Sequence, residues 1–330
     1  MKLVCSLFSC IFLLATYGQQ KDVMVKRTMK LMGTRFEITV VAPNEEIGYI
    51  NIDEAASEIK RIEKIISSWD ENSETASINK NAGIKPIKVS PELYGLIERA
   101  KKISEITDGA FDISYASMDN IWKFDGTMKG LPSEGEIKRS IAKIGHKKII
   151  LDPDEQTVFL KEKGMRIGFG AIGKGYAADK AKELMVSKQV KGGIINASGD
   201  LTTWGTKVTG EKWLVGIANP LSKEKVFSWL PVIESSVATS GNYEKYIIIN
   251  DKKYSHIIDP RTGYPTSGIN SVSVFAKNAE LCDALATAIF IMGKDIGVHL
   301  INQIDGVEVV VVDSNNKIHK SSGILFEKNQ

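Results

Sequence analysis

The stretch GFGAIGKGYAAD, residues 168–179, carries the strongest evidence on the fold. Its first six residues match the G-x-G-x-x-G fingerprint of dinucleotide-binding Rossmann folds, and they stand between a strand-like MRI and an amphipathic helix, as that fingerprint requires. The Rossmann fold also needs an acidic residue about 20 positions further on and a series of βαβ units. The candidate Asp200 lies 27 positions after Gly173 (200 − 173 = 27), and no such series follows. The match is therefore weak evidence for a Rossmann fold.

The same residues nearly fit a second phosphate-binding pattern, the P-loop G-x-x-x-x-G-K-[ST]. Gly175 stands where that pattern needs a Ser or Thr for magnesium, so the P-loop interpretation fails. What remains is a general property, because glycines ahead of a helix let backbone N–H groups approach an anion. Lys174 in the first helical turn opposes the helix dipole, and an adjacent phosphate or carboxylate would relieve this. A tight turn with a solvated lysine is the alternative.

The segments around this stretch contain helices and strands without a regular alternation. Helices are expected at 53–69, at 91–107, after a capping box formed by Ser133 and Glu136, and at 279–303 with a break near Gly293. Strands are expected at 27–42 around Gly33, in a hairpin at 146–151 and 157–161, at 165–167, at 192–197, in much of 213–275, and at 307–312. This order favours an α+β fold over a doubly wound sheet.

Length and charge narrow the class of protein. The chain has 330 residues, with 43 Lys and Arg against 40 Asp and Glu, so its formal net charge is only +3. This balance provides no basic field for a row of phosphates and argues against general nucleic-acid binding. The 43% hydrophobic and 25% charged residues are typical of a folded globular protein. A chain longer than about 250–300 residues tends to divide its core, so we expect two lobes with a cleft between them.

The N-terminus has the pattern of a signal peptide over residues 1–18. Lys2 precedes an apolar run from Leu3 to Ala15, and small residues precede a plausible cut before Gln19. The run is shorter than the ~20 residues of a membrane-spanning helix, and an uncleaved anchor is the alternative. We therefore expect one domain at 19–330 in an exported protein, either in the periplasm or attached to the inner membrane. Beyond residue 18 the only cysteine is Cys282, so no internal disulfide is expected.

Two neighbouring stretches gather reactive side chains near loop ends, where functional sites are usually built. They are TSGNY at 239–243 and YSHIIDPRTG at 254–263. His256 is one of only four histidines and is a candidate for proton transfer near pH 7, with a structural role as the alternative. The run from Asp259 to Gly263 is also compatible with a simple turn, opened by Asp and closed by Gly.

Asp283 and Thr287 are spaced i, i+4 in a segment that is otherwise apolar, so they share one face of the expected helix. A carboxylate in such surroundings is costly unless it is paired or bound to a cation. Carboxylate, hydroxyl and carbonyl oxygens suit Mg²⁺ and not zinc. The alternative is an aspartate satisfied by the helix backbone and a threonine that bonds the carbonyl one turn earlier.

Taken together, these segments resemble the ApbE-type FAD:protein FMN transferases, formerly called thiamine-biosynthesis lipoproteins. The blocks occur in the family's order and span nearly all of residues 19–330: Met32–Thr34, Thr107–Ile113, Gly168–Asp179, Asn196–Asp200, Trp213–Pro220, Thr239–Gly241, Ser255–Pro260 with Thr262–Gly263, and Asp283 with Thr287. Each block is modest alone, whereas the ordered set is specific.

The resemblance implies an activity and a fold. Members of this family are exported enzymes that use FAD and Mg²⁺, transfer the FMN half to a Thr or Ser hydroxyl of an acceptor redox protein, and release AMP. The implied fold is a two-lobed α+β unit, related to the T-fold, with the nucleotide cleft between its lobes. The implied partners are FAD and flavoprotein subunits of membrane redox complexes, with no nucleic acid.

The resemblance also implies roles for single residues, carried over by position. His256 and Lys174 match catalytic positions. The positions that contact FAD are Met32, Ala110, Phe111, Asp112, Lys174, Ser240 and Ile257. The magnesium ligands are Ala171, through its backbone carbonyl, Asp283 and Thr287. Two residues depart from the family pattern, because many relatives carry an acidic residue in place of Gly168 and a glycine in place of Ser198.

Three other interpretations of function stay open. Water could replace the acceptor hydroxyl, which would make the protein a Mg²⁺-dependent FAD pyrophosphatase that yields FMN and AMP. The protein could bind FAD without turnover. A Rossmann oxidoreductase would instead bind NAD(P) with no preference for FAD.

Overall fold

The computed structural model describes residues 21–128, 130–218, 226–232, 234–242, 246–249 and 252–325. Its centre is an eight-stranded sheet in which every neighbouring pair is antiparallel. The strand order is β1 (Val23–Leu31), β2 (Thr34–Ala42), β6 (Gly192–Ala197), β7 (Asp200–Gly205), β10 (Ser236–Gly241), β13 (Ile269–Ala276), β14 (Glu308–Asp313) and β15 (Ile318–Lys320). An antiparallel sheet excludes the parallel Rossmann sheet and confirms the α+β class.

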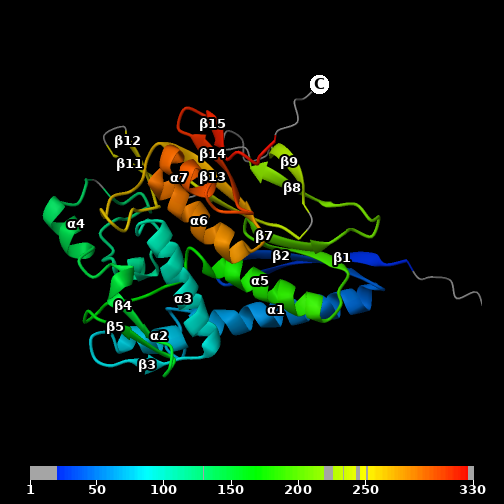
Figure 1. The fold of residues 1–330 in the computed structure, drawn as a ribbon, viewed down its shortest axis with the longest axis horizontal. Coiled ribbons are helices and arrows are strands. Elements are labelled where there is room, and N and C mark those ends of the chain that lie inside the picture. The colour runs from blue at the N-terminus through cyan, green and yellow to red at the C-terminus, as the bar shows by residue number, and fades with distance from the viewer. Residues whose placement is uncertain are drawn as a thin grey trace, which may run out of the picture.

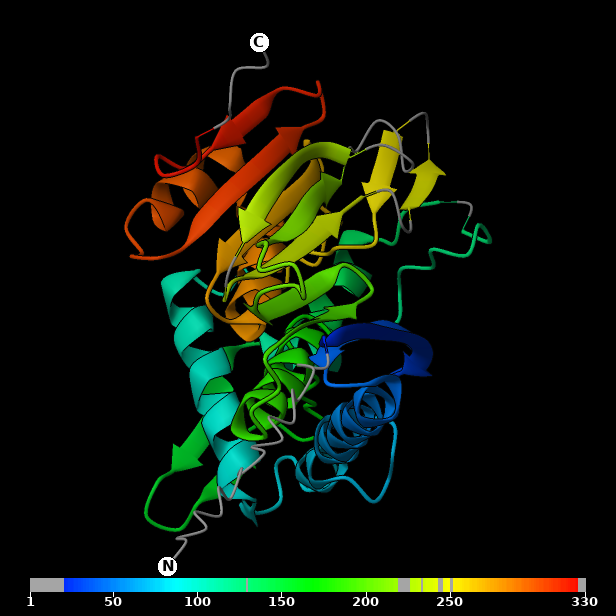
Figure 2. The same ribbon diagram turned by 90° about the vertical axis from the view of Figure 1, so that its right-hand side faces the viewer.

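Three helices cover one face of this sheet, as Figures 1 and 2 show. They are α1 (Glu45–Ile66), α5 (Gly173–Ser187) and α6 (Ala279–Met292), and α5 contacts both of the others. Helix α1 packs on β1 and β2, whereas α6 packs on β10 and β13. The buried face of α1 includes Ile52, Ile59 and Ile62, which are fully shielded from solvent in the main core. Ile59 and Ile62 lie in the helix predicted at 53–69, whereas Ile52 precedes it, so the packed face of α1 extends beyond the predicted helix.

The opposite face of the sheet carries a smaller core beneath the hairpin of β8 (Trp213–Ala218) and β9 (Val226–Val232). Trp213 and Val215 pack there with Val237 and Phe275. The Trp213 indole N–H donates to the carbonyl of Trp204, which lies in β7. Both faces of the central sheet are thus covered, which fixes the positions of its strands beneath the helices.

A mostly helical region follows α1 in the chain. It contains α2 (Glu74–Lys80), α3 (Pro91–Ile106), η1 (Ile113–Ser117), α4 (Glu134–Ser140), η2 (His146–Lys148) and a small sheet of β3 (Ile87–Lys88), β5 (Thr157–Leu160) and β4 (Ile149–Asp152). The Ser90 hydroxyl accepts the Leu93 N–H at 3.2 Å and so caps α3. Ser133 and Glu136 form the predicted capping box of α4. Both predicted helix starts are confirmed.

A third small core joins this region to the hairpin of β11 (Tyr246–Ile249) and β12 (Lys252–Ser255). The Trp122 ring stacks on Tyr254 with 6.2 Å between centroids, and its indole N–H donates to the Gly263 carbonyl at 2.9 Å. This core supports the segment between β12 and β13, where His256 lies. Helix α7 (Lys294–Ile301) follows α6 after the predicted break at Gly293.

Three predicted segments differ from the structure. Residues 165–167 form no strand, because Asn79 and Ser117 supply hydrogen bonds that a neighbouring strand would otherwise provide: the Asn79 side chain bonds the N–H and C=O of Ile167, and the Ser117 hydroxyl those of Arg166. Residues 146–148 form a 3₁₀ turn and not the start of the hairpin. Helix α1 begins at Glu45, where the Asn44 side chain caps it, and not at Asp53.

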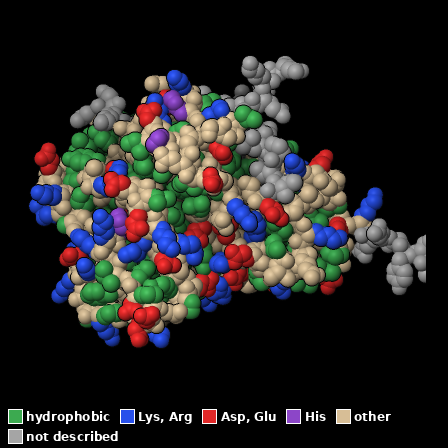
Figure 3. All heavy atoms as spheres, in the orientation of Figure 1, with side chains coloured by type: hydrophobic (Ala, Val, Ile, Leu, Met, Phe, Trp, Pro, Cys, Tyr) green, Lys and Arg blue, Asp and Glu red, His purple; other side chains and the backbone are tan. Residues whose placement is uncertain are grey.

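The surface is mixed in charge. On the face drawn in Figure 3, Lys and Arg side chains are interspersed with Asp and Glu, in keeping with the small net charge. In the described part of the chain, no helix is long and apolar enough to cross a membrane. The predicted signal peptide at 1–18 lies outside the described residues.

Candidate active site

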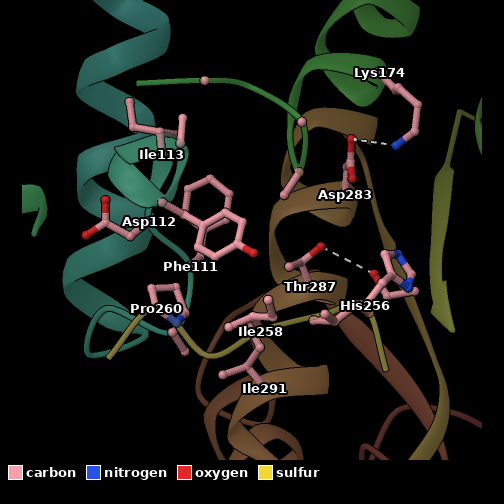
Figure 4. A pocket seen from close by; sticks show the side chains of 18 of the residues that line it. Phe111, Asp112, Ile113, Lys174, His256, Ile258, Pro260, Asp283, Thr287 and Ile291 are labelled. Atoms are coloured by element: carbon pink, nitrogen blue, oxygen red, sulfur yellow. Dashed lines mark hydrogen bonds and ion pairs between the residues drawn. The ribbon is translucent and has the colours of Figure 1, made fainter. Parts of the chain in front are cut away.

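One cavity of about 440 Å³ brings together distant parts of the chain. It lies where the start of α5, one face of α6, the end of β10 and the segments before η1 and after β12 meet, as Figure 4 shows for part of its lining. Among its lining residues are Ala110, Phe111, Asp112, Ala171, Lys174, Ser240, His256, Ile257, Asp283 and Thr287. Every predicted site residue except Met32 therefore lines one cavity.

Met32 lies beside the cavity rather than in its wall. It occupies the turn between β1 and β2 with a φ of +49°, a conformation that non-glycine residues adopt rarely. Its N–H donates to a carboxylate oxygen of Glu63 at 3.2 Å. Its side chain packs against the main core, with the terminal methyl group near Gly173 at the start of α5.

The first turn of α5 is capped by another helix. Ile172, at the N-cap position, makes no side-chain capping bond. The Gly175 N–H donates to Oδ2 of Asp283 at 3.2 Å, and among the described residues no donor meets the carbonyl oxygen of Ala171. Gly175 is the third residue of α5, so its N–H is one of the donors at a helix start that have no acceptor within the helix. The Asp283 carboxylate thus satisfies this donor, while the Ala171 carbonyl, which lies before the N-cap, accepts no hydrogen bond from a described residue.

Close packing of α5 on α6 explains why position 175 is a glycine and not the Ser or Thr of the P-loop pattern. A Cβ at Gly175 would stand only 2.1 Å from the Ala279 carbonyl oxygen, so only glycine permits this approach. The Asp179 carboxylate accepts the N–H groups of Ala279 at 2.9 Å and Glu280 at 2.8 Å, and it therefore caps α6. Each helix start is held by a carboxylate of the other helix. Burial raises the pKa of Asp179 to about 6, although these two hydrogen bonds oppose the shift.

Lys174 lies between two buried carboxylates. Its Nζ is 2.5 Å from Oδ2 of Asp200 and 3.4 Å from Oδ2 of Asp283. Burial lowers the pKa of Lys174, but the charges of Asp283 and Asp200 outweigh this and raise it overall. Burial, reinforced by the charge of Asp283, raises the pKa of Asp200 although Lys174 opposes the shift. In the sequence, Asp200 is a Rossmann candidate and the end of a family block with no predicted partner, so its pairing with Lys174 is a finding of the structure.

Thr287 lies one turn after Asp283 on the cavity face of α6, as the i, i+4 spacing predicted. Its hydroxyl oxygen is 3.3 Å from that of Ser240, which lies in β10. The sequence alternative paired this hydroxyl with the carbonyl one turn earlier, whereas its partner in the structure comes from the sheet. Ser240 therefore orients Thr287 from the strand on which α6 packs.

His256 and Ile257 reach the cavity from the segment after β12. His256 is half-buried, and in Figure 4 it lies on the side of the cavity opposite to Asp112. The segment after it, from Asp259 to Gly263, forms the simple turn that the sequence allowed, because the Asp259 carbonyl accepts the N–H of Gly263 at 2.8 Å. The Asp259 carboxylate binds Arg261 beside it. Of the charged or basic groups in this segment, His256 is the one in the cavity lining.

Asp112 lines the cavity, but its carboxylate is already engaged. Oδ1 accepts the Ser114 N–H and hydroxyl at 2.8 and 2.6 Å, and Oδ2 accepts the His146 N–H at 2.7 Å. In Figure 4 the carboxylate points away from Asp283 and Thr287. A ligand in the cavity would therefore meet the backbone around Asp112 rather than its charge.

Two aromatic residues that the sequence did not single out also line the cavity, Trp69 and Tyr115. Trp69 is 92% exposed and follows the end of α1. Helical spacing placed it in α1, so no pattern marked it for the cavity. Only the fold brings it there.

The oxygen atoms near Asp283 fit a hard cation. The set consists of the Asp283 carboxylate, the Thr287 hydroxyl and the unbonded carbonyl of Ala171, all at one cavity. Oxygen ligands of this kind suit Mg²⁺, whereas zinc prefers His and Cys. Within the described ranges, no group of three or more His, Cys, Asp or Glu side chains is arranged to hold a metal.

Comparison with known proteins identifies the family. A model of the ApbE family matches residues 32–311. The FAD:protein FMN transferase of Klebsiella pneumoniae is 31% identical over 266 residues, which cover 80% of this chain and 82% of that protein. The enzyme of the same name from Treponema pallidum is 28% identical over 316 residues, which cover 91% of this chain and 87% of that protein.

A solved structure agrees with these matches. The crystal structure of the ApbE protein from Thermotoga maritima superposes with a TM-score of 0.82 at 30% identity, covering 91% of this chain and 97% of that one. The fold, the cavity and the relatives therefore lead to one conclusion. The chain belongs to the ApbE family and is a homologue of proteins named FAD:protein FMN transferase.

Proposed function

We propose that this protein transfers FMN from FAD to a Thr or Ser hydroxyl of an acceptor redox protein and releases AMP. One observation carries the proposal: a histidine, a lysine and an oxygen ligand set from distant segments line the same cavity in an ApbE-family chain. Flavin transfer needs a cation for the diphosphate and a base for the hydroxyl at one place, and residues suited to each role line this cavity. The nucleotide cleft between two lobes is part of this proposal.

FAD would bind with its diphosphate at the start of α5. The helix start favours negative charge, and Lys174 adds a cation within the same turn. Gly168 would leave room for the nucleotide, because a Cβ there would stand 3.1 Å from the Cβ of Ala116 and would narrow the lining. Met32 would contact FAD only at the edge of the site.

Asp283, Thr287 and the Ala171 carbonyl would hold Mg²⁺. Bound there, Mg²⁺ would neutralise the charge that develops on the phosphate oxygens as the bond to AMP breaks. The fit rests on the chemistry of these oxygen atoms, to which the Ala171 carbonyl adds one that accepts no hydrogen bond from a described residue.

His256 would act on the acceptor. Its imidazole would take the proton of the Thr or Ser hydroxyl as the hydroxyl oxygen forms a bond to the phosphorus on the FMN side. The bond from that phosphorus to the bridging oxygen breaks, and AMP leaves with the bridging oxygen. Lys174 would stabilise the charge on the phosphates during this step.

The proposal also names an acceptor protein and a cellular compartment. We propose flavoprotein subunits of membrane redox complexes as acceptors, met on the periplasmic side after export. The support is the signal-like pattern of residues 1–18 in the sequence.

The test is mass spectrometry of an acceptor domain after incubation with the purified protein, FAD and Mg²⁺. We expect one added FMN on the acceptor and an equal amount of AMP. AMP release that ignores the acceptor would instead identify a pyrophosphatase, and FAD binding with neither product would identify a flavin-binding protein. Asp283→Ala should remove transfer, and Asp313→Asn, at a residue of β14 outside the cavity lining, should not.

A further inference from the structure

Lys174 contacts two buried carboxylates in the cavity, those of Asp200 and Asp283. Its contact with Asp283 conflicts with the proposal that this carboxylate binds a metal ion. Lys174 comes from α5, Asp200 from β7 and Asp283 from α6. Nζ is closer to Asp200, at 2.5 Å, than to Asp283, at 3.4 Å. With all three groups ionised, the cluster carries one net negative charge, which a cation can balance.

The conflict concerns Asp283. A divalent cation on this carboxylate would stand close to the ammonium group that already contacts it, and like charges repel strongly where water is limited. The cation must therefore compete with Lys174 for Asp283. Unless Lys174 has another anionic partner, every cation that binds must also push a partly buried ammonium group away from its counter-charge.

Asp200 provides that partner. Asp200 is only 5% exposed, and it is the first residue of β7, directly after the β6–β7 turn. Its position is therefore fixed by the sheet. A carboxylate buried this deeply needs its own counter-charge, and Lys174 is the cation in direct contact with it. The Lys174 side chain is 31% exposed, so solvent reaches part of it beside the two carboxylates.

We propose that Asp200 is a positioning residue that holds Lys174 when a divalent cation takes Asp283. In the metal-free protein, Lys174 contacts both carboxylates and balances one of their two charges. When the cation binds, Nζ stays on Asp200 and leaves Asp283, so Lys174 remains beside the phosphates while the metal has its ligand. This inference rests on the proposed function through the assignment of Asp283 as a metal ligand.

Metal binding without nucleotide tests the inference independently of transfer activity. The probe is Mn²⁺ alone, titrated into the full chain and followed by the electron paramagnetic resonance signal of the free ion. Four proteins form a cycle: wild type, Asp200→Asn, Lys174→Met and the double variant. We expect Asp200→Asn to weaken Mn²⁺ binding at least about fivefold more when Lys174 is present than when it is Met.

The outcomes separate two failures. If Asp200→Asn weakens Mn²⁺ binding equally in both backgrounds, Asp200 acts only through its own charge and the inference is overturned. If Asp283→Ala leaves Mn²⁺ binding unchanged, the metal assignment itself is wrong and the proposed function loses its cation site. Asp313→Asn is the matched control, because Asp313 is also a buried carboxylate with a basic partner, His319 at 2.9 Å, and its loss should not alter Mn²⁺ binding.

A second measurement needs no substitution at the cluster, in case Asp200→Asn fails to fold. A crystal of the wild-type protein soaked in Mn²⁺ should show the ion on Asp283 and Nζ of Lys174 about 3 Å from Asp200. An ion on Asp283 with Nζ still in contact with that carboxylate, or with Nζ away from both, would overturn the inference.

Discussion

His256 is the residue whose loss should separate binding from chemistry. Because it lines the cavity without belonging to the proposed metal ligands, His256→Ala should lower the transfer rate by about 10²–10⁴ and leave FAD affinity within about threefold. Single-turnover transfer followed by mass spectrometry gives the rate, and quenching of flavin fluorescence gives the affinity. His299→Ala, on α7, is the control and should change neither. A rate above a tenth of the wild-type value would remove His256 from the chemistry.

Ser198 is strained, and its replacement by glycine should stabilise the protein. It lies in the β6–β7 turn with a φ of +58°, which costs a non-glycine residue about 1–2 kcal/mol. Part of this gain is offset by the greater freedom of glycine in the unfolded chain, so we expect Ser198→Gly to raise the free energy of unfolding by about 0.5–1 kcal/mol. Urea unfolding measures it. Ser198→Ala keeps the Cβ and should give no gain, and an equal gain from both would contradict the strain argument.

The sequence predicted which residues line the cavity, but it did not predict which of them contact one another. Lys174, His256, Asp283 and Thr287 carry chemistry that shows in their residue types and in the order of their blocks. Asp200 and Asp179 were not assigned, because an aspartate at the start of a strand or within a helix gives no sign of its partner on another element. Their roles depend on which helices approach each other.

At the scale of elements, the packing of α5 on α6 should depend on Gly175. A methyl group there meets the Ala279 carbonyl at 2.1 Å, so Gly175→Ala must push the two helices apart and should cost about 1–3 kcal/mol of unfolding free energy. Thermal and urea unfolding measure the loss. Gly170→Ala is the matched control in the same glycine loop, because nothing lies within 4 Å of a Cβ there. Equal stability of the two variants would contradict the close approach.

Asp179, which caps α6, should give that packing a pH dependence. Burial raises its pKa from 3.8 to about 6, so the folded state binds a proton more tightly than the unfolded state does. Its contribution to stability is therefore complete below pH 4 and is lost as the pH rises through about 6. The wild-type free energy of unfolding should fall relative to that of Asp179→Asn by up to roughly 3 kcal/mol between pH 4 and 7. A pH-independent difference between the two proteins would contradict the shift.

Elements with local signals were predictable, and those that depend on distant partners were not. The helices at 91–106 and 134–140 begin where Ser90 and Ser133 cap them, because a cap acts within four residues. The strand predicted at 165–167 does not form, because the side chains of Asn79 and Ser117 bond the backbone groups of this segment. Both residues lie far from it in the chain, so no local pattern could indicate these contacts. The antiparallel order of the central sheet was likewise beyond any local pattern, although the irregular order of elements correctly favoured α+β.

At the scale of the whole molecule, Cys282 reports on ligand binding. It is fully buried in α6 beside Asp283, and burial raises the pKa of its thiol well above the usual range, so it should react only when the protein opens. In the presence of Mg²⁺, FAD at about 100 times its dissociation constant should stabilise the folded state by about 2.7 kcal/mol. A thiol reagent should then label Cys282 about 100-fold more slowly.

In Asp283→Ala, the Mg²⁺-dependent part of the protection should vanish. Labelling of Cys282 at the same rate with and without FAD and Mg²⁺ would mean that neither ligand binds the folded state.

The pairing of β2 with β6 sets the order in which the chain can assemble. It places Phe36 opposite Ala197 and Val40 opposite Gly193, so the polypeptide between 43 and 191 must be closed into a loop before the sheet is continuous. The β1–β2 ribbon alone is marginal in water, and closing so long a loop is entropically costly and slow. The pairing of β6 with β2 should therefore limit the rate of refolding. Until it forms, the unpaired edge of β2 can pair with a strand of another chain.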